Sequence, residues 1–212
     1  MSSRELIVRY LAERARPRAL VPLAALLAAA GALSNPRGQE SASDLAIAAV
    51  AALAFVLAFR VWDDLEDRTR DAREHPGRVT VIVTRHSPLI AVSLGLAAAG
   101  ASLVALGPRI GVRLAAAGVA AVVLLVWYRL RPEAPRGVIN GHVVLLKYPA
   151  FAFAVSPAAP APAVLASLYL ALCVFEVIDD PTLRGSVLAR RIAMSECALV
   201  IATAFFLGGR LS

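Results

Sequence analysis

Long apolar runs dominate this sequence and restrict the folds that it can adopt. Hydrophobic residues make up 59% of the chain, against the roughly 45–50% of a soluble domain. The runs are about 20 residues long, which is the length that a helix needs to cross a bilayer core. They are continuous and rich in Ala, Leu and Val, whereas the strands of a membrane barrel alternate over about ten residues. We therefore expect one all-α integral-membrane domain over residues 1–212, a polytopic bundle with about seven spans, at 17–35, 43–61, 87–106, 110–128, 137–156, 160–178 and 191–208.

The basic residues follow this topology. The net charge is +7, but arginine-rich and arginine-poor segments alternate from one expected span to the next, so the charge does not point to nucleic acid as a partner. The positive-inside rule then places the N-terminus in the cytoplasm. Residues 1–16 form a short amphipathic segment that Pro17 ends, and we expect it along the cytoplasmic surface of the plasma (inner) membrane.

An acidic run follows the second expected span. Asp64, Asp67 and Asp71 are spaced i, i+3 and i+7, so a helix that continues through them presents three carboxylates on one face. Carboxylates suit Mg²⁺, which binds one or two of them and fills its other positions with waters and phosphate oxygens. The alternative is a solvated loop whose charges form internal ion pairs.

Arginines follow the acidic run closely. Arg68, Arg73 and Arg78 are expected to bind phosphate oxygens that metal ions bridge to the carboxylates. The pattern recurs at the end of the sixth expected span, where Glu176 and Asp180 are spaced i and i+4 and arginines follow. Both acidic clusters are expected on the cytoplasmic side, where they predict a site for a polyphosphate ligand.

Ionisable residues also occur inside expected spans. Lys147 lies deep in the fifth span, which predicts a polar cavity or an acidic partner and a role in diphosphate binding. His142 is expected to be a hydrogen-bonded residue between helices, and Glu196 to pair with Arg190, Arg191 or Lys147. The cysteines, Cys173 and Cys197, are expected to be small packing residues.

Two acidic clusters facing a helical cavity fit the chemistry of an isoprenyl diphosphate. Breaking its allylic carbon–oxygen bond leaves a diphosphate, which cations stabilise, and an allylic carbocation, which a dry apolar cavity protects from water. The residues resemble the UbiA-type superfamily of membrane prenyltransferases. The run from Asp63 to Asp71 is similar to its first motif with Asp in place of Asn, and Glu176 to Asp180 is similar to its second with Glu in first position.

The resemblance implies a UbiA-like bundle and a set of roles. Asp64, Asp67 and Asp180 would carry the ionisation step, next to the basic residues that are expected from their own positions to bind the diphosphate, namely Lys147, Arg68, Arg73 and Arg78. The Mg²⁺ ligands would be Asp63, Asp64, Asp67, Asp71, Glu176, Asp179 and Asp180.

The expected reaction is transfer of the prenyl group to a small or lipophilic acceptor within the membrane. Two alternatives stay open: a membrane terpene cyclase, for which the run from Asp63 to Asp67 has the Asp-Asp-x-x-Asp pattern, and a non-catalytic membrane protein on the same scaffold. The family usually has nine helices, so a second copy of the chain, in a homo-oligomer, is one way to close the cavity wall.

Overall fold

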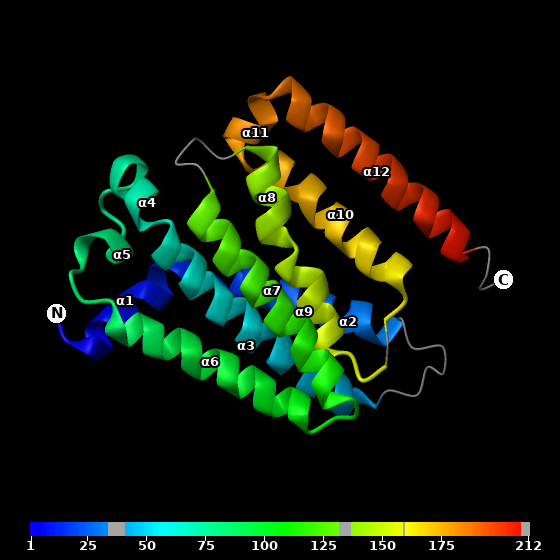
Figure 1. The fold of residues 1–212 in the computed structure, drawn as a ribbon, viewed down its shortest axis with the longest axis horizontal. Helices are drawn as coiled ribbons and strands as arrows, with labels where there is room; N and C mark the ends of the chain where they lie inside the picture. The colour runs from blue at the N-terminus through cyan, green and yellow to red at the C-terminus, as the bar shows by residue number, and fades with distance from the viewer. Residues whose placement is uncertain (34–40, 132–136, 159, 209–212) are drawn as a thin grey trace.

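The computed structural model describes residues 1–33, 41–131, 137–158 and 160–208, and this part of the chain is helical without strands (Figure 1). The helices are α1 (Ser3–Arg14), α2 (Pro17–Leu33), α3 (Ala42–Glu66), α4 (Arg68–Glu74), α5 (Val79–Ile82), α6 (Ser87–Ala105), α7 (Ile110–Leu130), α8 (Val138–Leu145), α9 (Lys147–Val155), α10 (Pro162–Asp179), α11 (Pro181–Gly185) and α12 (Val187–Gly208). The all-α prediction is confirmed.

Five segments of the described chain are long and apolar enough to cross a membrane: α3, α6, α7, α8 together with α9, and α10. A sixth is counted if α1 and α2, which meet at an angle of 76°, are one broken span. The helices are therefore compatible with an integral membrane protein. The expected span 191–208 lies in α12, which is not among these candidates, so seven spans stay a prediction.

Helix α3 is the centre of the bundle, and it packs against α2, α6 and α9. Small residues allow this close packing. For example, Gly100 of α6 lies against the ring of Phe55, and a Cβ atom at Gly100 would come within 3.2 Å of that ring. Its 25 residues give it a length of about 37 Å. This exceeds the roughly 30 Å of a hydrocarbon core, so α3 is longer than an untilted span requires.

The acidic run lies at the C-terminal end of α3. The helix ends at Glu66, Asp67 forms a turn, and α4 continues from Arg68, so the expected continuous helix is interrupted at one residue. Helix α10 likewise ends within an acidic cluster, at Asp179. Pro181 begins α11, and the residue before a proline is disfavoured in the helical conformation, which explains the extended backbone of Asp180.

The expected span 137–156 is also divided into two helices. Helices α8 and α9 meet at Leu146, whose N–H bonds the carbonyl oxygen of Val143 three residues back. Lys147 is the first residue of α9. The break therefore lies directly beside the lysine that the sequence singled out.

Candidate functional site

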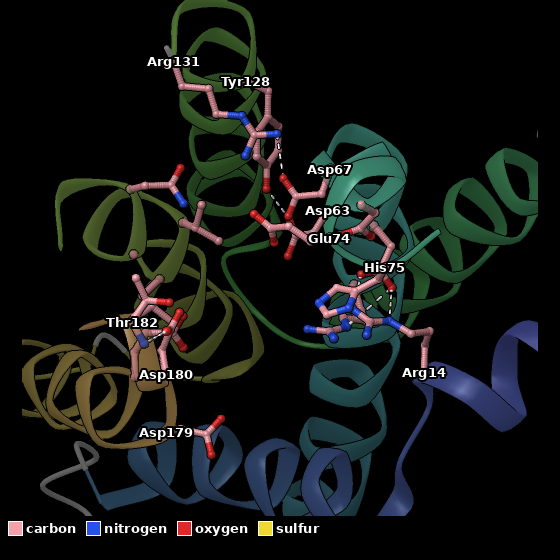
Figure 2. Close-up of a pocket in the computed structure, with 18 of the residues that line it drawn as sticks. Arg14, Asp63, Asp67, Glu74, His75, Tyr128, Arg131, Asp179, Asp180 and Thr182 are labelled. Carbon is pink, nitrogen blue, oxygen red and sulfur yellow. Dashed lines mark hydrogen bonds and ion pairs between the residues drawn. The ribbon is translucent and has the colours of Figure 1, made fainter. Parts of the chain in front are cut away.

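The acidic ends of α3 and α10 line one cavity of about 480 Å³. Figure 2 shows Asp63 and Asp67 on one side of it and Asp180 and Thr182 on the other. All seven predicted metal ligands line this cavity, namely Asp63, Asp64, Asp67, Asp71, Glu176, Asp179 and Asp180. Tertiary packing thus brings together two clusters that are more than a hundred residues apart in the chain.

Carboxylates of the first cluster are held by basic side chains from other helices. Asp63 accepts hydrogen bonds from the ammonium group of Lys147 and the hydroxyl of Tyr128. Asp67 forms an ion pair of 2.7 Å with Arg131, which follows α7. These contacts fasten α9 and α7 to the end of α3.

The Asp64 carboxylate is the most completely paired. Both of its oxygens accept from the Arg14 guanidinium, at 2.5 and 2.9 Å, and one of them also accepts from the Tyr10 hydroxyl at 2.8 Å. Asp64 is only 4% exposed, so these bonds are shielded from water. This residue therefore fixes α1 to α3, and a cation that bound Asp64 would have to displace Arg14.

Asp71 keeps one oxygen available. Arg78 pairs with Oδ1, whereas Oδ2 is buried and has no hydrogen-bond partner among the described residues. A buried carboxylate oxygen without a donor is costly unless a cation lies next to it. This oxygen fits a metal ligand.

The second cluster is held in a different way. The Asp180 carboxylate caps α11 by accepting from the backbone N–H groups of Thr182 and Leu183, at 2.7 and 3.4 Å. Asp179 is exposed, and the Glu176 side chain lies next to Gly141 of α8, which packs against α10. Among the described residues, Asp179 and Asp180 therefore form no ion pair of the kind that holds Asp64.

The charge balance of the cavity favours a cation. Eight carboxylates line it, against five Lys or Arg side chains, so the formal excess is three negative charges. This excess negative charge would repel an anionic ligand that arrives alone. Divalent cations that arrive with the ligand would neutralise the excess. The donor set consists of oxygens, which suits Mg²⁺.

The predicted basic residues are only partly brought together. Lys147 and Arg78 line the cavity, but Arg68 and Arg73 do not. Arg68 donates to the carbonyl oxygen of Leu65 and contacts the His86 ring, and Arg73 lines a smaller neighbouring cavity. The structure therefore places Lys147 and Arg78 at the cavity and Arg68 and Arg73 outside its lining, and a role for these two arginines in diphosphate binding stays a prediction.

Sequence reasoning missed several residues that line the cavity. They include Arg14, Arg60, Tyr128, Arg131 and Asn140. Arg14 and Arg131 belong to the arginine-rich segments that border expected spans, and nothing in the neighbouring sequence distinguishes them from the other arginines there. Arg14 is 50 residues from its partner Asp64, and Arg131 is 65 residues from its partner Glu66. No short spacing along the chain therefore predicts these contacts.

An aromatic cluster lies directly beneath the charged cavity. Trp62 packs edge-on against Tyr128 with ring centroids 5.7 Å apart, and Phe59 packs between Trp62 and Phe151. Tyr148 also lines the cavity and contacts Phe151. The site therefore changes from polar to aromatic within one or two turns of α3.

The sequence suggested that Glu196 pairs with Arg190, Arg191 or Lys147, and this expectation was wrong. The Glu196 carboxylate instead lies 2.6 Å from Nε2 of His142. His142 was expected to be hydrogen-bonded between helices, and this contact joins α8 to α12 as that expectation requires.

Comparison with known proteins gave no assignment: no protein-family model, no curated protein and no solved structure matches this chain.

Proposed function

We propose that this protein is a Mg²⁺-dependent membrane enzyme that ionises an isoprenyl diphosphate and transfers the prenyl group to a small acceptor. The observation that supports it most directly is the convergence of two distant acidic clusters on one cavity that also contains a cationic lysine and adjoins an aromatic cluster. The motif resemblance to UbiA-type prenyltransferases agrees with this arrangement. The proposed site faces the cytoplasm, in the plasma membrane.

The proposed metal ligands are the carboxylates with oxygens that face the cavity. Asp67 and Asp71 would hold Mg²⁺ on one side, and Glu176, Asp179 and Asp180 on the other. Bound there, Mg²⁺ would neutralise charge on the diphosphate as the carbon–oxygen bond breaks. Asp63 and Asp64 serve chiefly to orient their neighbours, because both oxygens of each carboxylate already accept from Lys147, Tyr128 or Arg14, whereas Asp71 keeps Oδ2 available.

Fixed basic groups would hold the diphosphate itself. Lys147 is buried at 3% exposure and points into the cavity from the start of α9. Arg78 and Arg131 also line the cavity. Because these cations are positioned in advance by their carboxylate partners, they stabilise developing negative charge without reorganising during the reaction.

The apolar part of the site would exclude water from the carbocation. Val144, Leu145 and Tyr148 line the cavity below the charged groups, and the aromatic cluster packs behind them. Aromatic faces attract a cation within about 6 Å by their quadrupole. The same feature favours a second candidate, cyclisation of the prenyl chain, since a cyclase also has to guide a carbocation.

Release of diphosphate by the purified protein tests the proposal. With a prenyl diphosphate, Mg²⁺ and a membrane extract as acceptor source, we expect Asp67→Asn and Asp71→Asn each to slow release by about 10²–10³-fold. Asp44→Asn is the matched control, because it removes the same charge from the distant end of α3 and should retain activity. Full activity in both cavity variants would exclude the metal assignment.

The acceptor requirement separates the candidates. If the substrate is consumed only when acceptor is supplied, the protein is a transferase, and if a cyclic hydrocarbon or alcohol forms without acceptor, it is a cyclase. Binding of Mg²⁺ and diphosphate without turnover in either assay would identify a non-catalytic protein on this scaffold.

A further inference from the structure

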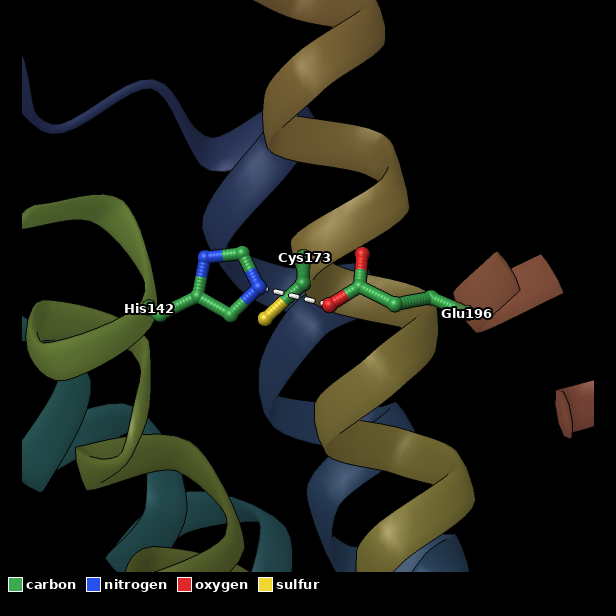
Figure 3. Close-up of side chains that lie close together, drawn as sticks. All are labelled: His142, Cys173 and Glu196. Atoms are coloured by element: carbon green, nitrogen blue, oxygen red, sulfur yellow. Dashed lines mark hydrogen bonds and ion pairs between the residues drawn. The ribbon is translucent and has the colours of Figure 1, made fainter. Parts of the chain in front are cut away.

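A second group of metal-binding side chains lies outside the charged cavity. His142 of α8, Cys173 of α10 and Glu196 of α12 point toward one another, and their ligand atoms all lie within 4.8 Å of each other (Figure 3). Cys173 is 1% exposed and Glu196 is 6% exposed. We propose that these three residues form a site for a transition-metal ion of the Zn²⁺ class.

The hydrogen bonds of His142 define what its second nitrogen needs. Nδ1 lies 2.7 Å from the carbonyl oxygen of Val138, which can only accept, so Nδ1 carries the hydrogen. Nε2 of a neutral ring then has only a lone pair, yet it faces a Glu196 oxygen at 2.6 Å. Two lone pairs repel at this distance, so a cation, either a proton or a metal ion, belongs between them. The bond to Val138 is also the type of contact that orients metal-binding histidines.

Glu196 supplies the observation that favours a metal ion over a proton. A proton on Nε2 would satisfy Oε1 alone, whereas Oε2 is buried and has no hydrogen-bond partner among the described residues. A metal ion can draw on both carboxylate oxygens and on the Cys173 sulfur. The unsatisfied oxygen therefore has a partner only in the metal-bound form.

Geometry and charge agree with this assignment. Tetrahedral Zn²⁺ holds neighbouring N, O and S ligand atoms about 3.3–3.6 Å apart, so each side chain has to move by about 1 Å or less. A thiolate and a carboxylate together neutralise a divalent ion, and a neutral complex is favourable in a bundle interior. Thiolate and imidazole select Zn²⁺ or similar ions over Mg²⁺, so this site differs in chemistry from the charged cavity.

The site would fasten α12 to the bundle. Within the described chain, α12 packs mainly on α10 and α11, and the His142–Glu196 contact reaches across to α8. Gly141, the neighbour of His142, lines the charged cavity. A bound ion would therefore hold the outer helix and the cavity wall in a fixed relation.

Cobalt titration of the chelator-treated protein in detergent tests the site. We expect one Co²⁺ per chain, a thiolate-to-cobalt charge-transfer band and visible bands of tetrahedral cobalt, all displaced by Zn²⁺ and unaffected by Mg²⁺. Absence of a saturable cobalt band in the folded wild-type protein would overturn the proposal, whatever the outcome of the prenyl diphosphate assays.

Variants of the two cysteines identify the ligand. Cys173→Ser should abolish the charge-transfer band and weaken binding by more than the roughly 10–100-fold that loss of a supporting residue costs. Cys197→Ser is the matched control, since Cys197 adjoins Glu196 in α12 but is exposed, and it should keep the band. A band that survives Cys173→Ser would overturn the assignment. If Cys173→Ser fails to fold, Glu196→Gln should lower the affinity while retaining the sulfur band, and unchanged affinity there would count against the site.

Discussion

The two acidic clusters share one cavity but differ in what holds their carboxylates. Each aspartate of the first cluster, from Asp63 to Asp71, forms an ion pair with a Lys or Arg. In the second cluster Asp180 accepts backbone N–H groups and Asp179 is exposed, and neither forms an ion pair within the described chain. The first cluster is thus both a candidate site and a structural junction. Substitutions there test folding and chemistry together, whereas a substitution in the second cluster that keeps the cap of α11, such as Asp180→Asn, tests chiefly the chemistry.

The largest expected effect is loss of Lys147. Because this lysine is buried against Asp63, Lys147→Met leaves an unpaired carboxylate, and we expect the free energy of unfolding in detergent to fall by about 3–5 kcal/mol. Lys147→Met with Asp63→Leu should recover much of that loss. Affinity for a prenyl diphosphate should also decrease in the single variant.

Arg113 provides a control for the lysine. It is buried too, but its guanidinium donates to backbone carbonyl oxygens, such as those of Ala154 and Val155, rather than to a carboxylate. Arg113→Met should destabilise the fold and leave the diphosphate affinity of the remaining folded protein unchanged. Equal losses of affinity in both variants would contradict the role of Lys147.

Release of α1 should have the next largest effect. Arg14→Gln removes the guanidinium fork that donates to both oxygens of Asp64. Hydrogen bonds to charged groups contribute about 1.5–3 kcal/mol to stability. Limited proteolysis should then cut the first 16 residues faster. Arg16→Gln, at an exposed neighbouring position, is the control and should be cut at the wild-type rate. Equal rates for the two variants would show that the fork does not hold α1.

Asp180 allows a cleaner separation of roles. Asp180→Ala removes the cap of α11 and should lower stability by about 1 kcal/mol, whereas Asn caps nearly as well as Asp and should cost only a few tenths. Both variants remove the charge, so both should lose Mg²⁺-dependent diphosphate release. Activity that survives in Asp180→Asn would mean that the residue is only a helix cap.

The smallest expected effect distinguishes two arginines that look alike in sequence. Arg68→Gln removes contacts to Leu65 and His86 outside the cavity and should change stability by less than about 0.5 kcal/mol, with no change in diphosphate affinity. Arg78→Gln should weaken that affinity, because Arg78 lines the cavity. Binding of a labelled prenyl diphosphate to both variants checks the difference, and a reversed order would refute it.

Much of the fold could be predicted because apolar length and period are local properties. The runs that became α3, α6, α7 and α10 were recognisable in the sequence, and so was the unusual position of Lys147 inside an apolar run. The break at Asp67 and the division at Leu146 were not predicted, since both depend on what the backbone packs against. The final expected span remains a prediction for a different reason: the charges of Arg190, Arg191 and Glu196 make its composition ambiguous.

By itself the sequence determined that the chain is helical and apolar, and that two of its helices end in carboxylates. Only the tertiary structure decided which charges meet. Arg14 reaches Asp64, Arg131 reaches Asp67, and His142 reaches Glu196, although each pair is separated by 50 residues or more. Side-chain pairing at such separations depends on helix packing and on the need to neutralise each buried charge. Neither has a periodic signature along the chain.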